Sequence, residues 1–418
     1  MRTFKAKALL GAGSLTLALV GAAQAGGFSR GTADTDILFD AGNFNIRAGV
    51  TYVSPKREFS KAPAKKPTDV GDPQGLVGTS YTDDYIVPSM AIKMNLTDNL
   101  RCAATMVDNN GGSATYAVPK PSGKLSEEFT TNEKALTCGV KFQAGPGNIW
   151  ILGGGFMENF DYSRQNALGT LPNGVALPNA NLQLSGQDTG YRIGIAYEIT
   201  DIALRAQLMY RSGTSYGADG SLTVPTAGVL GQQAKIAAAA GRFGDAGLLL
   251  GQAAKAAAAG LNTTVPATGT GNLPQSVEFK LQSGIAPGWL AFGSVKWMDW
   301  SVQKELLVNS ALSNTADEYF WKDGWTVTGG VGHAFNDRVS GLVSLTWDSG
   351  VSTGYDFSSD TYTLALGGSL KDSLGGELRA GVGVSYLTSA EITKGGDTGF
   401  AVKDGYALAG SIGYNIKW

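Results

Sequence analysis

The last thirteen residues of the chain, 406–418, alternate strictly between two kinds of side chain. On one face of an extended strand fall Tyr406, Leu408, Ile412, Tyr414, Ile416 and Trp418, and on the other fall Ala407, Ala409, Ser411, Asn415 and Lys417. An apolar face with aromatic ends, backed by a small or polar face, is typical of a strand between lipid and a polar lumen. Strands of soluble β-sandwiches also alternate between apolar and polar residues, so this segment alone does not distinguish a sandwich from a membrane barrel.

The composition favours a membrane barrel. The chain has 418 residues, of which 59 are glycine and 43% are hydrophobic, yet its mean hydropathy is only -0.04. After the N-terminus no apolar run reaches the roughly 18 residues of a membrane helix, whereas barrel strands carry a weak signal of this kind. The net charge of -2 predicts no nucleic-acid partner.

Residues 1–25 have the pattern of a secretory signal peptide. Basic residues precede an apolar stretch over 8–20, and Ala23-Gln24-Ala25 forms a cleavage site before Gly26. A membrane anchor is the alternative, but the apolar stretch is too short for one. Export permits a disulfide between the two cysteines, Cys102 and Cys138, which fall on the apolar faces of neighbouring predicted strands. The alternative is two free thiols that face lipid.

Period-two alternation predicts an all-β chain of about fourteen strands within residues 43–418. The predicted strands are 43–54, 84–96, 99–108, 131–143, 148–160, 189–199, 201–212, 273–286, 289–302, 325–335, 338–348, 361–370, 377–388 and 405–418. Short connections rich in Gly, Pro, Asn and Asp alternate with long ones, of which 213–272 is the longest. Short periplasmic turns and long outer loops are the rule in outer-membrane barrels, and bare lipid requires the sheet to close.

The two faces of the predicted strands differ in charge. The inner face carries Arg47, Arg101, Arg192, Glu198, Arg205, Glu278, Lys280 and Arg379, which we expect to be paired charges that fill the lumen; a role in substrate binding is the alternative. Aromatic residues near the strand ends predict interfacial girdles on the outer face: Tyr52, Trp289, Trp325, Trp347, Tyr362, Tyr386, Tyr406 and Trp418.

Two segments are not predicted to be barrel strands. Residues 26–42 precede the first strand and contain the apolar patch 37–39, which favours burial in the lumen as a hatch over a free periplasmic tail. Residues 231–241 and 251–260 are similar Ala-, Gln- and Lys-rich runs that each end in Gly, which predicts a helical hairpin in the loop 213–272. We expect this hairpin to cap the pore mouth; a packed loop without a ligand role is the alternative.

Enzymatic chemistry is not indicated. The single histidine, His333, falls on the lipid-facing side of its strand, where a catalytic triad has no place for it. The sequence has no nucleophile-elbow, phosphate-loop or metal-cluster motif, so we expect no enzyme activity, no cofactor and no metal.

The stretch 273–301, which begins Leu273-Pro274 and ends Trp297-Met-Asp-Trp300-Ser301, resembles the outer-membrane long-chain fatty-acid transporter family (FadL/TodX type). The opening 43–59 is similar to the first strand of that family. The resemblance implies a fourteen-stranded monomeric barrel with an N-terminal hatch, apolar outer loops, a lumenal pocket and a sideways exit near the third strand. The Asn-Pro-Ala motif of the family hatch is replaced here by Asp40-Ala41-Gly42, and the segment is shorter, so we expect a reduced hatch.

The sequence therefore predicts passive uptake of hydrophobic compounds across the outer membrane of a Gram-negative bacterium, with long-chain fatty acids first and aromatic hydrocarbons second. The expected surroundings are outer-membrane lipid and lipopolysaccharide. Candidate capture residues are Phe243, Leu248, Leu249 and Leu250, and candidate hatch residues are Phe28, Ile37, Leu38 and Phe39. A general diffusion porin for polar solutes and a structural or adhesin-like barrel are the alternatives.

Overall fold

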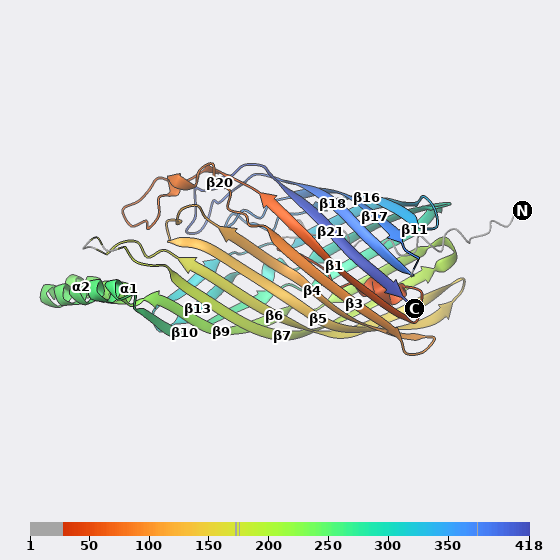
Figure 1. Ribbon diagram of the computed structural model, residues 1–418, viewed down its shortest axis with the longest axis horizontal. Helices are drawn as coiled ribbons and strands as arrows, with labels where there is room; N and C mark the ends of the chain where they lie inside the picture. Colours follow the sequence, from red (N-terminus) through yellow and green to blue (C-terminus); the bar gives the residue numbers. More distant parts are fainter. Residues whose placement is uncertain (1–27, 172–173, 175, 374) are drawn as a thin grey trace, which may run out of the picture.

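Fourteen antiparallel strands close into a barrel in the computed structural model, which describes residues 28–171, 174, 176–373 and 375–418 (Figure 1). The strands are β1 (Phe44–Lys56), β3 (Tyr85–Asn95), β4 (Leu100–Thr115), β5 (Lys124–Ala144), β6 (Gly147–Asn166), β7 (Ala180–Ile199), β8 (Leu204–Arg211), β11 (Ser276–Ala286), β12 (Trp289–Met298), β15 (Gly324–Ala334), β16 (Val339–Asp348), β17 (Thr361–Lys371), β18 (Gly376–Leu387) and β21 (Gly405–Lys417). Because β1 pairs with both β3 and β21, the first and last strands close the cylinder. The predicted strand number is confirmed, and the predicted signal peptide lies outside the described residues.

The outer connections contain structure of their own. The wall is extended by β9 (Thr214–Pro225), β10 (Asn262–Leu273), β13 (Glu305–Ser310) and β14 (Asn314–Glu318), while β2 (Phe59–Lys61), β19 (Ala390–Glu391) and β20 (Ala401–Val402) form a separate small sheet. The helical elements are η2 (Thr35–Phe39), η3 (Pro73–Leu76), η4 (Thr200–Ile202), η5 (Trp300–Val302), α1 (Thr226–Ala239) and α2 (Phe243–Ala258). Among the described residues, no helix has the length and apolar character that a membrane span needs.

The helical hairpin differs from its prediction in bounds and position. The residues 243–250, expected to link two helices, form the first half of α2, since Leu and Ala favour helix strongly enough to tolerate the intervening glycines. Gly241 and Gly260 end the two helices with positive φ, as predicted. The hairpin projects beyond the barrel at the tip of the β9–β10 ribbon instead of lying across the mouth (Figure 1). A two-stranded ribbon that continues straight from the wall carries the helices outward.

The outer wall has the predicted character. The girdle residues Tyr52, Trp325 and Tyr406 expose between 44% and 52% of their surface. His333 lies on this outer face and its ring packs 4.3 Å from the ring of Trp289. Cys102 and Cys138, directly opposite each other on β4 and β5, form a disulfide, which confirms that hypothesis over two free thiols.

Candidate functional site

An aromatic pocket lies inside the extracellular part of the wall. Its lining comes from β5, β6, β9, β10, η5, β13 and the segment after β14: Phe129, Phe160, Tyr162, Tyr216, Asn272, Leu273, Trp300, Gln303, Leu306, Tyr319 and Trp321. The rings of Phe160 and Tyr216 stack at 3.9 Å, and those of Trp300 and Trp321 meet edge to face at 5.2 Å. The free cavity is only about 30 Å³, which is room for about two or three water molecules. The pocket therefore has to rearrange before it can take a ligand.

Burial keeps the pocket uncharged. Burial, followed by the negative charge of Glu158, raises the pKa of Tyr216, and burial, followed by Glu127, raises the pKa of Tyr319. Both phenols are therefore neutral at physiological pH. An aromatic, neutral cavity favours apolar or aromatic ligands, because rings pack well edge to face and stacked.

The phenyl ring of Phe28, at the start of the described hatch, is held by this aromatic cluster. Its centroid lies 4.7 Å from that of Trp321, 5.5 Å from that of Phe129 and 6.2 Å from that of Trp300. The Cβ of any residue other than glycine at position 112 would come within 2.9 Å of this ring, so Gly112 makes the room for it. The hatch thus places a benzene-like group against three walls of the pocket.

The remainder of the hatch is anchored deeper in the lumen. Ile37 and Leu38 are fully buried against inward-facing residues of β3, β4, β6 and β7. Phe39 packs edge to face on Trp150 at 5.3 Å and lies under the guanidinium of Arg205 at 4.5 Å. The four predicted hatch residues are all in contact with the barrel or its lining, which fits a reduced hatch that is folded inside the wall.

Wall cations meet hatch carboxylates. Arg47 pairs with Asp34 at 2.8 Å and with Asp40 at 2.5 Å, and Lys280 pairs with Asp36 at 3.3 Å. Two further wall cations donate to hatch carbonyls: Lys93 to those of Asp40 and Gly42, and Arg101 to that of Leu38. The predicted pairing of lumenal charges is confirmed for Arg47 and Lys280, whose carboxylate partners here lie on the hatch, whereas Arg101 binds a hatch carbonyl.

A buried ionic layer separates the aromatic pocket from the periplasmic part of the lumen. Arg211 donates to Glu133 at 2.7 Å and to Glu158 at 2.8 Å, and Arg192 also pairs with Glu133. Glu158 is two residues on the periplasmic side of Phe160 along the inner face of β6. An apolar solute that moves straight down the barrel axis would have to desolvate this layer, which is costly.

The wall opens beside this layer, between the second and third barrel strands. Pairing of β3 with β4 ends at Ser89 and Val107, although both strands continue, and β4 shifts its register with β5 around Asn109. A bulge of this kind bends a strand and ends pairing with a neighbour. Asn109 is the bulged residue, and its amide donates to Glu158 of the ionic layer.

Hatch residues cover the exposed edge of β4. The backbone N–H groups of Arg30 and Gly31 donate to the carbonyl of Asn109 at 2.8 and 3.3 Å, and Gly111 donates to the carbonyl of Phe28 at 2.8 Å. Gly31 fits tightly there, since a Cβ would lie 2.6 Å from Val107. The same short segment that reaches the aromatic pocket thus closes the gap in the wall.

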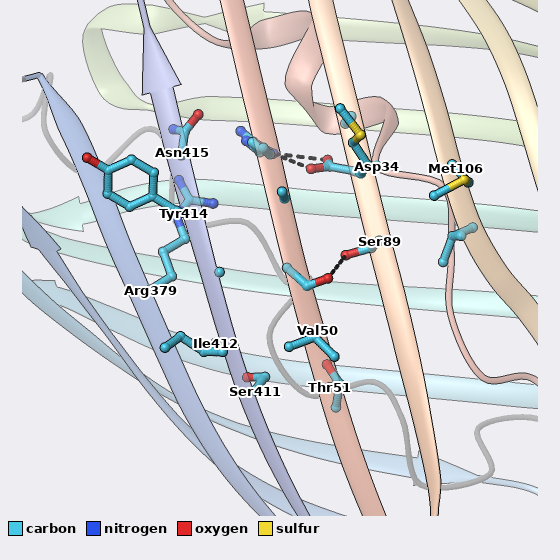
Figure 2. Close-up of a pocket in the computed structure, with 17 residues that line it drawn as sticks. Asp34, Val50, Thr51, Ser89, Met106, Arg379, Ser411, Ile412, Tyr414 and Asn415 are labelled. Carbon is cyan, nitrogen blue, oxygen red and sulfur yellow. Dashed lines mark hydrogen bonds and ion pairs between the residues drawn. The ribbon is translucent and has the colours of Figure 1, made fainter.

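A small crevice also lies where β21, β1 and β3 meet. Unlike the opening between β3 and β4, it does not interrupt the pairing of the strands. It has a volume of about 60 Å³, and both inward residues such as Asp34 and outward residues such as Tyr414 line it, because Gly49 and Gly413 thin the wall (Figure 2). The pairing of β1 with both neighbours is in register throughout this region. An unbroken ladder of hydrogen bonds closes the seam.

The predicted capture residues lie far from the pocket, on α2. Phe243 and Leu248 expose 74% and 70% of their surface, whereas Leu249 and Leu250 pack partly on Ala234 and Ala237 of α1. The pocket itself was not predicted from the sequence, although two of its lining residues, Leu273 and Trp300, belong to the stretch 273–301 that carries the family resemblance. The available signal was a run of aromatic residues, Phe156, Phe160 and Tyr162, on the inward parity of β6.

A closed fourteen-stranded barrel with a lumenal hatch, an aromatic pocket and a wall gap defines an outer-membrane channel for hydrophobic compounds. The family of outer membrane protein transport proteins (OMPP1/FadL/TodX) matches residues 37–340, and this chain belongs to it. The channel therefore lies in the outer membrane of Gram-negative bacteria, and transport is in keeping with the non-enzymatic prediction.

Solved structures share the fold at low sequence identity. A FadL homologue of Pseudomonas aeruginosa is 14% identical, with a TM-score of 0.67 over 95% of this chain and 97% of that chain. The toluene transporter TodX of Pseudomonas putida is 12% identical, with a TM-score of 0.60 over 96% and 99% of the two chains. The toluene transporter TbuX of Ralstonia pickettii is 10% identical, with a TM-score of 0.58 over 96% and 97%. A comparison with curated protein sequences finds no match.

Proposed function

We propose that this channel takes up aromatic hydrocarbons by passive diffusion, through the aromatic pocket and out sideways past β4. The observation that carries the proposal is the ring of Phe28, which the pocket holds against Phe129, Trp300 and Trp321. A free aromatic ligand can replace this ring at similar contacts. Each square ångström of apolar surface that leaves water contributes about 25 cal/mol, which supplies the affinity without an energy source.

Displacement of Phe28 links entry to exit. Residues 28–31 both contact the pocket and pair with the bulge of β4, so movement of the ring out of the pocket strains the hydrogen bonds at Asn109 and Gly111. The buried ionic layer below opposes a straight path, while the wall gap leads to the membrane. The ligand therefore leaves toward lipid, in which it is soluble.

Long-chain fatty acids are the second candidate, and one observation favours them. A small cavity between the hatch and the wall is lined by Thr32, Glu278 and Lys296, and the ammonium of Lys296 lies 3.5 Å from the Thr32 hydroxyl. This lysine is placed to pair with a carboxylate whose tail lies in the aromatic pocket. Uptake of long-chain fatty acids, the first candidate from the sequence, would therefore depend on Lys296, whereas uptake of aromatic hydrocarbons would not.

We further propose that the α1–α2 hairpin collects apolar molecules on the exposed side chains of Phe243 and Leu248. Leu249 and Leu250 chiefly hold the two helices together. The channel acts as a monomer whose outer wall contacts outer-membrane lipid and lipopolysaccharide.

Uptake of labelled toluene and labelled oleate by cells that lack their own hydrophobic channels tests these proposals. Trp321→Ala is expected to lower toluene uptake about fivefold or more, since it removes ring contacts in the pocket. Its matched control, Trp325→Ala, removes an outer girdle tryptophan of the same size. Lys296→Gln is expected to lower oleate uptake only, and deletion of 231–260 to lower both at low concentration.

Equal loss of toluene uptake in Trp321→Ala and Trp325→Ala would contradict the pocket assignment. Unchanged uptake after deletion of 231–260 would remove the capture role of the hairpin. Steady ion conductance of the wild-type channel in planar bilayers would favour the diffusion porin.

A further inference from the structure

The outer wall carries a lysine at the level of the outer membrane interface. Lys134 of β5 points to the same side as the lipid-facing Leu136. It lies as far along its strand from the periplasmic end as Tyr386 of the outer girdle lies along β18. Its direct cross-strand neighbours are Met106 and Met157. Within the described part of the chain Lys134 forms no ion pair, whereas Lys56, at the same rim on β1, pairs with Asp84 at 3.5 Å.

A groove in the lipid-facing wall begins at this lysine. It is a shallow depression bordered by Ala104, Lys134, Leu136, Gly155, Met157 and Thr189 on four adjacent strands. The groove exists because Ala104 and Gly155 are small where their neighbours Leu136 and Tyr191 are large. A shallow apolar groove below a cation suits one acyl chain below an anionic headgroup.

A polar shelf continues from the groove toward the cell exterior on the same strands. A hollow of about 510 Å³ is lined there by three carboxylates, those of Glu128, Asp161 and Asp219, and by the polar side chains of Thr130, Ser163, Gln183 and Ser185, among others. Thr130, Asp161, Ser185 and Asp219 are consecutive cross-strand neighbours on β5, β6, β7 and β9. Hydroxyl, amide and carboxylate groups in a row accept and donate the hydrogen bonds that sugar hydroxyls make.

We propose that this outer face of β4–β7 and β9 is a binding site for a phosphorylated glycolipid of the outer leaflet, lipopolysaccharide. The acyl chain lies in the groove, a phosphate of the headgroup pairs with the Lys134 ammonium, and the sugars lie along the shelf. The cation accounts for the negative charge of the ligand, and the acceptor-rich shelf accounts for its hydroxyl donors. The proposal rests on the proposed contact of the outer wall with lipopolysaccharide and assigns that contact to a particular site. Because the site faces away from the lumen, it does not depend on the ligand that is transported.

Two pairs of variants test the two halves of the membrane-level site. Lys134→Ala removes the cation, and Lys56→Ala is its matched control, because it removes an ion-paired lysine at the same rim. Gly155→Leu fills the groove without a clash, since a Cβ there meets only a backbone oxygen at 3.7 Å. Gly153→Leu is its control, because it lies one outward position away on β6, in open space.

Native mass spectrometry of the full chain in detergent measures binding of purified lipopolysaccharide, its dephosphorylated form and phosphatidylglycerol. Lys134→Ala and Gly155→Leu are each expected to bind lipopolysaccharide about fivefold more weakly than the wild type, and both controls to bind it normally. Dephosphorylation is expected to weaken binding to the wild type about fivefold and to leave binding to Lys134→Ala unchanged. Heat-modifiable mobility on gels confirms that every variant is folded.

Normal binding by Lys134→Ala, or equal binding of both forms by the wild type, would overturn the phosphate assignment. Equal binding of phosphatidylglycerol would overturn the assignment to a glycolipid. Toluene uptake by Lys134→Ala is expected to equal that of the wild type, so this proposal and the transport proposal fail separately.

Discussion

The two ends of the hatch are held in the barrel by different forces. Residues 28–31 are held by ring contacts of Phe28 and by three backbone hydrogen bonds to the edge of β4. Residues 34–42 are held by Arg47 and Lys280 through buried ion pairs and by fully buried Ile37 and Leu38. A hydrophobic ligand can replace the ring contacts of Phe28, whereas it cannot replace the ion pairs that hold residues 34–42. The hatch thus combines a displaceable end with a fixed one.

The largest expected effect comes from the fixed end. Arg47→Ala leaves Asp34 and Asp40 without their arginine, and the loss of one partner of a buried pair costs about 3–5 kcal/mol. A cysteine introduced by Leu38→Cys is expected to react with a thiol reagent about a hundredfold faster in this background. Arg338→Ala, at an exposed periplasmic turn, is the control. Equal labelling rates of Leu38→Cys in the Arg47→Ala and Arg338→Ala backgrounds would show that the ion pairs do not hold residues 34–42 in place.

A smaller effect is expected at the displaceable end. Phe28→Ala removes contacts with three aromatic rings, which predicts about tenfold faster labelling of a cysteine introduced by Ser29→Cys. Labelling at Leu38→Cys is expected to stay unchanged, because the ion pairs remain. Phe335→Ala removes a lipid-facing phenylalanine and serves as the control. Faster labelling at both positions would mean that the hatch moves as one unit.

The smallest effect is expected from the wall beside the displaceable end. In Gly111→Ala the new Cβ would lie 2.5 Å from the Arg30 guanidinium, which stacks over Tyr85 at 4.4 Å. Because a guanidinium ends a flexible side chain, it can move aside, and we expect about two- to threefold faster labelling of Ser29→Cys. Gly153→Ala, in open space on the outer wall, is the control. Identical labelling rates in Gly111→Ala and Gly153→Ala would show that Arg30 does not help to hold residues 28–31.

The strands were predictable because lipid imposes a strict rule on them. Every spanning strand needs an apolar outer face, so period-two alternation located all fourteen strands, and the wall residues Arg47 and Lys280 fell on the inner parity as expected. Beyond these fourteen strands, β9, β10, β13 and β14 extend the wall, and one face of β9, β10 and β13 packs into the buried cluster around Phe160 and Trp300. Small and polar residues in these strands keep their sequence pattern weak.

The aromatic pocket was not predictable for a related reason. Tyr216, Trp300 and Trp321 are far apart in the sequence and lie at the ends of different elements, so no local pattern connects them. The helical hairpin shows the opposite case. Its composition predicted helix correctly, but its position depends on the direction in which the β9–β10 ribbon leaves the wall, which composition does not encode.

The sequence by itself determined a closed barrel, its number of strands, the side of each strand that meets lipid and the existence of a short hatch, because each of these follows from periodicity, polarity and turn chemistry over a few neighbouring residues. Only the tertiary structure decided that hatch carboxylates are the partners of wall cations and that Phe28 reaches an aromatic pocket. It also decided that β3 and β4 separate beside Asn109. These features depend on contacts between distant segments, which form only once the barrel has closed around the hatch.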